Sequence, residues 1–283
     1  AGMKAAHLAN GGADVAKTAI HSVMRVLGQS CTPEASGCSV YDPNLSRADT
    51  DLSRLAERLA AAPDRGWSLL LSGPSGTGKS AFARHLAQVM RLEIEERRCS
   101  DLMSPYVGET EQNIAEAFAR AAERGALLLI DEVDSFLYRR EAGQRSWEVS
   151  QVNEMLVQLE HLRTPFVATT NLADNLDPAT QRRFTIRATF NAMTPAQASQ
   201  LFKARFGIDW PLEWPIHHGQ TPGDFAVVAH RANLLAERDP AVLVRWLRDE
   251  IEARGDRARG TMGFHVTGDT IARSALPAEP KAA

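Results

Sequence analysis

Leu69–Ser80 reads LLLSGPSGTGKS, an apolar run followed directly by a glycine-rich loop. From Gly73 to Ser80 the spacing is G-x-x-x-x-G-K-S, the pattern of a loop that binds phosphate between a strand and a helix. Its glycines permit backbone conformations in which consecutive amides point inward at phosphate oxygens. Lys79 can bring a positive charge to the β- and γ-phosphates, and the Ser80 hydroxyl can bind Mg²⁺. The stretch therefore predicts a site for a nucleoside triphosphate.

The sequence on both sides of this phosphate loop favours that interpretation over an ordinary glycine-rich turn. Trp67–Leu71 is apolar, as expected for a buried strand, and apolar residues repeat at helical spacing from Ala81 to Met90. The positive dipole end of that helix would face the phosphates. We expect the nucleotide to be bound by Gly73, Pro74, Ser75, Gly76, Thr77, Gly78, Lys79, Ser80 and Ala81.

Composition and charge narrow the class of protein. The chain has 283 residues, of which 44% are hydrophobic, enough for a sizeable core in one large domain or two smaller ones. A formal net charge of −3 gives no excess of basic groups, so we do not expect nucleic acid as a partner. No apolar run approaches the roughly 18 residues that cross a bilayer, and the amino end lacks the pattern of a secretion signal. We therefore expect a globular, cytoplasmic protein without a membrane partner.

Cysteines and histidines give no sign of a disulfide framework or a protease zinc site. The three cysteines form no C-x-x-C pair, and an odd number fits reduced thiols. The eight histidines include no H-E-x-x-H pattern.

Strand and helix patterns alternate between residues 51 and 191, the expected large α/β subdomain. Further strands are expected at Leu92–Arg98, Ala126–Ile130, Phe166–Thr169 and Thr185–Phe190. Helices are expected at Leu52–Ala61, after the phosphate loop, around Ile114–Ala121 and at Trp147–Leu162, with an irregular connection at Ser100–Glu109. This alternation predicts a doubly wound parallel sheet, in which ligands bind at the carboxyl ends of the strands.

The remaining segments have different patterns. Residues 1–50 carry one amphipathic helical pattern, Val15–Leu27, which fits either a connecting or docking helix or the remnant of a recognition domain. Residues 192–257 predict a small all-helical subdomain, and residues 258–283 are expected to be disordered. The helices expected in that subdomain are Gln197–Phe206, Thr221–Leu235 and Pro240–Ala253.

Two acidic residues follow the apolar run that ends at Ile130. The Asp131 carboxylate can hold Mg²⁺ through water, opposite Ser80. Glu132 can orient and polarise the water that attacks the γ-phosphate. Such a pair alone would fit a solvated turn, but after a phosphate loop it indicates a hydrolytic site.

Five motifs occur in a specific order along residues 51–255. They are GPSGTGKS at 73–80, SPYVGETEQNI at 104–114, LLLIDEVDSFL at 127–137, ATTNL at 168–172 and LDPATQRRF at 176–184. This order resembles the AAA type of the AAA+ ATPases, close to bacterial remodelling and unfolding ATPases. The resemblance implies a P-loop NTPase domain with a helical lid, ATP and Mg²⁺ as ligands, and hydrolysis that remodels a protein partner.

The resemblance also implies roles for single residues. Asn171 matches the sensor that contacts the γ-phosphate or the attacking water, where a plain strand-end turn is the alternative. Arg182 and Arg183 match arginine fingers that act in a neighbouring subunit's site, which implies a homo-oligomeric ring, most often a hexamer. Two solvated surface arginines are the alternative there.

A third implied role concerns the segment Tyr106-Val107-Gly108, which matches the aromatic pore loop that grips an extended polypeptide. The alternative is a Tyr106 ring packed against its own domain.

The sequence departs from the family pattern at several positions. Phe184 directly follows the arginine pair, where many members have Gly-Arg-Phe, and Pro105 stiffens the approach to the pore loop. Pro222–Phe225 resembles the Gly-Ala-Asp region in which AAA proteins lack a second sensor arginine. We therefore expect no sensor arginine in that region and place Gly223 near the nucleotide.

Two other functions stay open at this point. An ATP-dependent scaffold or switch, or a nucleic-acid-linked AAA+ ATPase, would assemble without threading a polypeptide, and Tyr106 is the residue that discriminates it. A P-loop kinase would transfer phosphate to an acceptor, and Asn171 together with the two arginines argues against it.

Overall fold

The computed structural model describes residues 41–134, 146–171 and 178–255. The helix expected at Val15–Leu27 and the tail expected at 258–283 lie outside the described residues, as do parts of the last three motifs. One compact unit of the chain begins at Tyr41 and contains every described residue.

A sheet of six strands in the order β1-β6-β2-β5-β4-β3 runs through the unit. The strands are β1 (Arg47–Ala48), β2 (Ser68–Ser72), β3 (Ile94–Arg98), β4 (Leu127–Asp131), β5 (Phe166–Thr170) and β6 (Ile186–Asn191). Strands β2 to β6 pair in parallel, which confirms the predicted sheet, whereas β1 pairs with β6 in antiparallel fashion. Strand β1 was not expected from the sequence, because two residues are too few for a periodic pattern.

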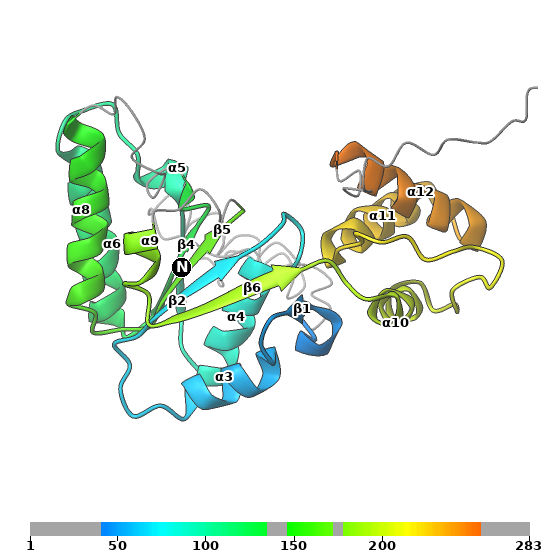
Figure 1. Cartoon of the computed structure of the whole chain (residues 1–283), viewed down its shortest axis with the longest axis horizontal. Coiled ribbons are helices and arrows are strands. Elements are labelled where there is room, and N and C mark those ends of the chain that lie inside the picture. Colours follow the sequence, from blue (N-terminus) through cyan, green and yellow to red (C-terminus); the bar gives the residue numbers. More distant parts are fainter. Residues whose placement is uncertain (1–40, 135–145, 172–177, 256–283) are drawn as a thin grey trace, which may run out of the picture. The chain divides into compact units, whose positions relative to one another are not determined.

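Helices cover both faces of this sheet. Leu69 and Leu71 pack in one cluster with α3 (Leu52–Ala60) and α4 (Lys79–Met90). Leu70, on the opposite face because side chains alternate along a strand, packs in a second cluster. That cluster includes residues of α6 (Glu109–Arg124) and α8 (Ser146–Glu160), on the other side of the sheet in Figure 1. Burial on both faces explains why the strands are continuous apolar runs and confirms the doubly wound architecture.

The connection after β3 differs from the irregular segment that was expected. Cys99–Leu102 forms a short helix, α5. The Asp101 carboxylate accepts a hydrogen bond from the Arg98 N–H at 3.1 Å, and Cys99 and Leu102 are buried in the core, so capping and burial together stabilise this turn.

The carboxyl-terminal part of the described chain is helical, as predicted. It contains α10 (Pro195–Phe206), α11 (Pro222–Leu235) and α12 (Pro240–Ala253), and these helices surround a core of their own. Each helix has proline in its first turn, where the missing N–H costs nothing. We call this region the lid.

Candidate functional site

The phosphate loop between β2 and α4 has a backbone that requires glycine. Gly73 has φ +130°, and a Cβ there would lie 2.2 Å from the Phe190 carbonyl oxygen of β6. The Thr77 hydroxyl donates to the Pro74 carbonyl at 2.8 Å and braces the turn. Because Gly78 is the N-cap of α4, no side chain caps this helix, and its first N–H groups can bind an anion. The loop therefore fits a phosphate group.

Lys79 lies under this loop, 7% exposed. Its Nζ donates to the carbonyls of Gly73 at 2.7 Å and Pro74 at 2.8 Å, and to Asn171 Oδ1 at 2.8 Å. Burial lowers the pKa of Lys79 to about 8, although nearby carboxylates oppose the shift. The structure thus brings the predicted loop lysine and the predicted sensor asparagine together.

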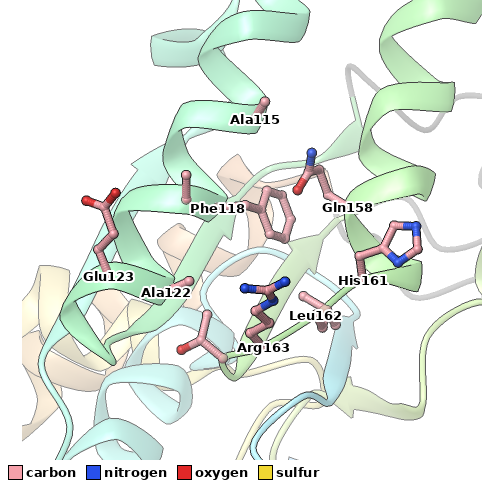
Figure 2. A pocket seen from close by; sticks show the side chains of 10 residues that line it. Ala115, Phe118, Ala122, Glu123, Gln158, His161, Leu162 and Arg163 are labelled. Carbon is pink, nitrogen blue, oxygen red and sulfur yellow. The ribbon is translucent and has the colours of Figure 1, made fainter.

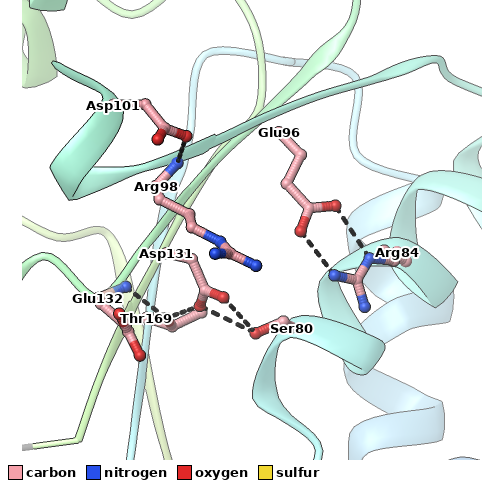
Figure 3. A network of polar contacts seen from close by, with 8 residues as sticks. All are labelled: Ser80, Arg84, Glu96, Arg98, Asp101, Asp131, Glu132 and Thr169. Carbon is pink, nitrogen blue, oxygen red and sulfur yellow. Dashed lines mark hydrogen bonds and ion pairs between the residues drawn. The ribbon is translucent and has the colours of Figure 1, made fainter. Parts of the chain in front are cut away.

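Ser80 and Asp131 meet where β4 ends (Figure 3). The Ser80 hydroxyl lies 2.9 and 3.0 Å from the two carboxylate oxygens of Asp131, and the Thr169 hydroxyl also donates to Asp131. Mg²⁺ prefers one or two carboxylates, waters and substrate phosphates to a dedicated cage of protein ligands. Ser80 and Asp131 therefore fit the protein side of a Mg²⁺–nucleotide site.

Glu132 is held in an unfavourable backbone conformation directly after β4. Its φ of +60° lies in the left-handed region, which costs a non-glycine residue on the order of 1 kcal/mol. Thr169 holds the turn on both sides: its hydroxyl accepts from the Glu132 N–H at 3.1 Å, and its carbonyl accepts from the Val133 N–H at 2.9 Å. The carboxylate of Glu132 is exposed to solvent at this edge, where a general base for water would be needed.

Sequence reasoning missed two residues that support these groups. Besides Thr169, Asp134 accepts a hydrogen bond from the Thr170 hydroxyl and another from the Asn171 N–H at 3.3 Å. In the sequence, Asp134 is recognisable only as an acid three positions after Asp131. Its partners Thr170 and Asn171 follow from the pairing of β4 with β5, which the sequence alone does not give.

Gly223 of the lid contacts the phosphate loop. Its N–H donates to the Gly76 carbonyl at 2.8 Å, and a Cβ on Gly223 would lie 2.8 Å from Gly76 Cα, so only glycine permits this approach. The nearby Gln220 side chain is 1% exposed, and its amide nitrogen and oxygen have no hydrogen-bond partner among the described residues.

The segment before β1 borders the same loop. A Cβ on Gly78 would lie 3.0 Å from Ser46 Oγ and 3.5 Å from a ring carbon of Tyr41. The Tyr41 hydroxyl donates to Ser46 Oγ at 3.0 Å, and burial raises the pKa of Tyr41 to about 12. Residues 41–48 therefore pack with the sheet and the phosphate loop.

Arg182 and Arg183 lie in the turn after α9 (Pro178–Gln181), and both are exposed. Arg183 forms an ion pair with Glu160 at the end of α8. Within the described residues, neither arginine makes a hydrogen bond or ion pair with the phosphate loop.

The predicted pore loop precedes α6. Tyr106 is 74% exposed and Val107 is 92% exposed, so the Tyr106 ring is not packed against its own domain. Gly108, with φ +85°, is the N-cap of α6.

The described part of the chain also contains a cavity away from the phosphate loop, and none of the residues predicted for the nucleotide site lines it. This cavity of about 650 Å³ lies between α6 and α8 (Figure 2), next to Phe118, His161 and Arg163. No group of three or more His, Cys, Asp and Glu side chains in the described ranges could hold a metal ion. None of the helices described is both long and apolar enough to cross a membrane.

Comparison with known proteins identifies the family. Residues 69–192 match the family described as "ATPase family associated with various cellular activities (AAA)". Fidgetin-like protein 1 of Drosophila melanogaster is 36% identical over 132 residues, which are 44% of this chain and 25% of that protein.

Two other relatives match over longer stretches of the chain. The ATP-dependent zinc metalloprotease FtsH 2 of Sphaerobacter thermophilus is 30% identical over 250 residues, 78% of this chain and 38% of that protein. Protein SUPPRESSOR OF K(+) TRANSPORT GROWTH DEFECT 1 of Arabidopsis thaliana is 31% identical over 190 residues, 64% of this chain and 42% of that protein. The chain thus spans less than half the length of these relatives. Through its ATPase domain, the chain belongs to the AAA+ ATPase superfamily.

Proposed function

We propose that this chain hydrolyses MgATP and uses the energy to remodel, unfold or disassemble a protein partner. Two contacts carry the proposal: Lys79 donates to Asn171, which follows β5, and Ser80 donates to Asp131, which ends β4. Strands β2, β5 and β4 are parallel neighbours, and the phosphate loop that carries Lys79 and Ser80 follows β2. Parallel sheets of this kind bind ligands at the carboxyl ends of their strands. The relative FtsH 2 is named as an ATP-dependent protease, which supports the coupling of ATP use to work on proteins.

In this proposal each side chain at the strand ends has one task. Lys79 leaves the loop carbonyls and places its charge on the β- and γ-phosphates. Ser80 and Asp131 hold Mg²⁺, which when bound neutralises charge on the phosphate oxygens. Glu132 accepts a proton from the attacking water, and Asn171 orients that water or the γ-phosphate.

We further propose that the active assembly is a homo-oligomeric ring, most simply a hexamer, in the cytoplasm. Arg182 would complete the site of a neighbouring subunit, because its side chain is exposed whereas Arg183 is already paired with Glu160. A guanidinium at such an interface offsets the negative charge that develops on the transferred phosphoryl group.

The exposed aromatic loop supports threading of an extended polypeptide as the mechanical output. We expect Tyr106→Ala to raise the Kd for fluorescein-labelled casein by a factor at least about ten times larger than the factor by which it lowers the rate of ATP hydrolysis. The reason is that a rigid aromatic ring buries much contact area at small entropic cost. Fluorescence anisotropy and phosphate release measure the two effects. Leu212→Ala is the control, since Leu212 is also an exposed apolar residue but lies in the lid.

The scaffold or switch alternative predicts a different outcome of the same experiment. It requires that Tyr106→Ala change neither polypeptide binding nor the processing of a partner captured by the Glu132→Gln protein in ATP. Equal losses for Tyr106→Ala and Leu212→Ala would also remove the argument for a pore loop.

The depressed pKa of Lys79 predicts that nucleotide affinity falls at alkaline pH. Phosphates next to Nζ raise its pKa again, so above pH 8 the bound site keeps a proton that the free site has lost. The Kd for MgATP should therefore rise by up to about tenfold for each pH unit above 8, until the pKa of the bound form is reached. The nucleotide contributes little to this trend, since its terminal phosphate, with a pKa near 6, is already ionised.

A titration with a fluorescent ATP analogue between about pH 7 and pH 9.5 measures this dependence. Lys79→Arg is the control, because a guanidinium stays charged over this range and any residual affinity should be independent of pH. A wild-type Kd that does not change across the range would contradict the assigned environment of Lys79.

A further inference from the structure

Arg254, which ends α12, holds the start of α11 through three acceptors. Its Nη1 donates to Thr221 Oγ1 at 2.7 Å and to Asp224 Oδ1 at 3.0 Å, and its Nη2 donates to the Gly219 carbonyl at 2.6 Å. The Asp224 side chain is only 8% exposed, and the Arg254 side chain is 21% exposed. A partly buried guanidinium with several acceptors fixes their relative positions, because its donors are arranged in a rigid plane.

The acceptors of Arg254 surround the residue that contacts the phosphate loop. Gly223 lies between Thr221 and Asp224, and its N–H donates to the Gly76 carbonyl at 2.8 Å. A Cβ on Gly76 would lie 2.8 Å from Thr221 Oγ1, the same hydroxyl that accepts from Arg254. One continuous series of contacts therefore joins the end of α12 to the nucleotide loop.

The turn is also braced from within. The Asp224 carboxylate accepts from the Thr221 N–H at 2.7 Å, so the carboxylate is shared between the backbone at the start of α11 and the Arg254 guanidinium. Loss of the guanidinium would leave the buried Asp224 carboxylate without its cation. The carboxylate would then move toward water or take up a proton, and either change weakens its hold on the turn.

We propose that Arg254 is a positioning residue for nucleotide binding: it keeps the Thr221–Asp224 turn against Gly76, so that lid and loop enclose the nucleotide together. This proposal rests on the proposed function, since it assigns Arg254 a task at the same site. It also makes the end of α12, far from the phosphate loop in sequence, a place from which nucleotide affinity can be changed.

The lid contains a matched arginine that separates this role from simple stabilisation. Arg231 of α11 pairs with Glu250 of α12 at 2.5 Å and lies over the Trp246 ring, so it too joins the two helices. Among the described residues, Arg231 makes no hydrogen bond or ion pair with the Thr221–Asp224 turn. Both substitutions, Arg231→Ala and Arg254→Ala, remove an ion pair between α11 and α12, but only the second releases the turn at the loop.

The test compares MgADP affinity in the two variants with that of the full wild-type chain. A fluorescent ADP analogue gives Kd, and thermal unfolding with and without MgADP gives stability and its nucleotide-dependent increase. We expect Arg254→Ala to raise Kd about tenfold, the usual size of coupling between linked sites, and Arg231→Ala to leave Kd within about twofold. In the absence of nucleotide, both variants should have a lower Tm than the wild-type chain, because each loses an ion pair.

A conservative variant covers the case in which Arg254→Ala does not fold. Arg254→Lys keeps a cation beside Asp224 but cannot also reach Thr221 and Gly219 in one plane, so we expect a smaller rise in Kd than for alanine. The proposal is overturned if folded Arg254→Ala or Arg254→Lys binds MgADP as wild type does, or if Arg231→Ala weakens binding to the same extent.

Failure of this proposal can be told apart from failure of the proposed function. If wild type binds MgADP and Lys79→Ala does not, the nucleotide site stands, and a normal Kd in Arg254→Ala removes only the role of Arg254. If wild type and Lys79→Ala bind alike, the nucleotide site itself is wrong.

Discussion

Glu132→Gln is expected to lower kcat for ATP hydrolysis by about 10²- to 10⁴-fold, the usual contribution of a general base, with nucleotide affinity nearly unchanged. Glutamine keeps the shape of the side chain but cannot accept the proton of the attacking water. The Thr169 bonds that hold this turn go to backbone groups and should remain. Steady-state phosphate release and the Kd for a fluorescent ATP analogue measure the two quantities.

Glu93→Gln is the matched control for this substitution. Glu93 is exposed and precedes the amino end of β3, whereas Glu132 follows the carboxyl end of β4, its parallel neighbour. The control should hydrolyse ATP at the wild-type rate. A fully active Glu132→Gln protein would show that another group activates the water.

The Glu132→Gln protein also offers the most direct way to identify the partner. If ATP stays bound without being hydrolysed, the assembly should retain proteins that wild type releases. Proteins that co-purify with the Glu132→Gln protein in ATP, but not with the Lys79→Ala protein, are candidates for the remodelled partner.

Arg182→Ala should lower kcat by about 10³-fold or more, because an arginine finger supplied to a phosphoryl-transfer site is worth about 10³ to 10⁵ in rate. Arg183→Ala should have a much smaller effect, since its guanidinium is already paired with Glu160 on the same chain. Kd for nucleotide should change little in either variant. Comparable losses in the two variants, or a larger loss for Arg183→Ala, would contradict the assignment of Arg182 as the main finger.

Mixing variants tests whether this arginine acts between subunits. Arg182→Ala subunits keep Glu132, and Glu132→Gln subunits keep Arg182, so a complete site forms only where the two kinds are neighbours in the right order. Hydrolysis by the mixture, from two preparations that are each nearly inactive, is the expected result. No recovery in mixed assemblies would argue against arginines that act in trans.

Local patterns in the sequence predicted most of the fold and the main groups of the site. The loop from Gly73 to Ser80 was recognisable because its glycines, lysine and hydroxyl must occur at fixed spacing to enclose phosphate. The strands were recognisable because burial on both faces requires continuous apolar runs, and the lid helices because their apolar residues repeat at helical spacing. Asp131 and Asn171 could be placed at the ligand-binding edge because each follows an apolar strand pattern, and parallel sheets bind ligands at the carboxyl ends of their strands.

Tertiary packing alone revealed how those groups are held. The supporting bonds of Thr169 and Asp134 depend on the strand order, which places β5 between β2 and β4 although other elements separate them in the chain. The contact of Gly223 with Gly76 and the hydrogen bond from Arg254 to Thr221 join residues from distant segments. Such contacts leave no periodic pattern, because they arise from the approach of two surfaces and not from the repeat of one helix or strand. The phosphate loop is therefore a local property of the sequence, whereas its contact with the lid through Gly223 is a property of the folded chain.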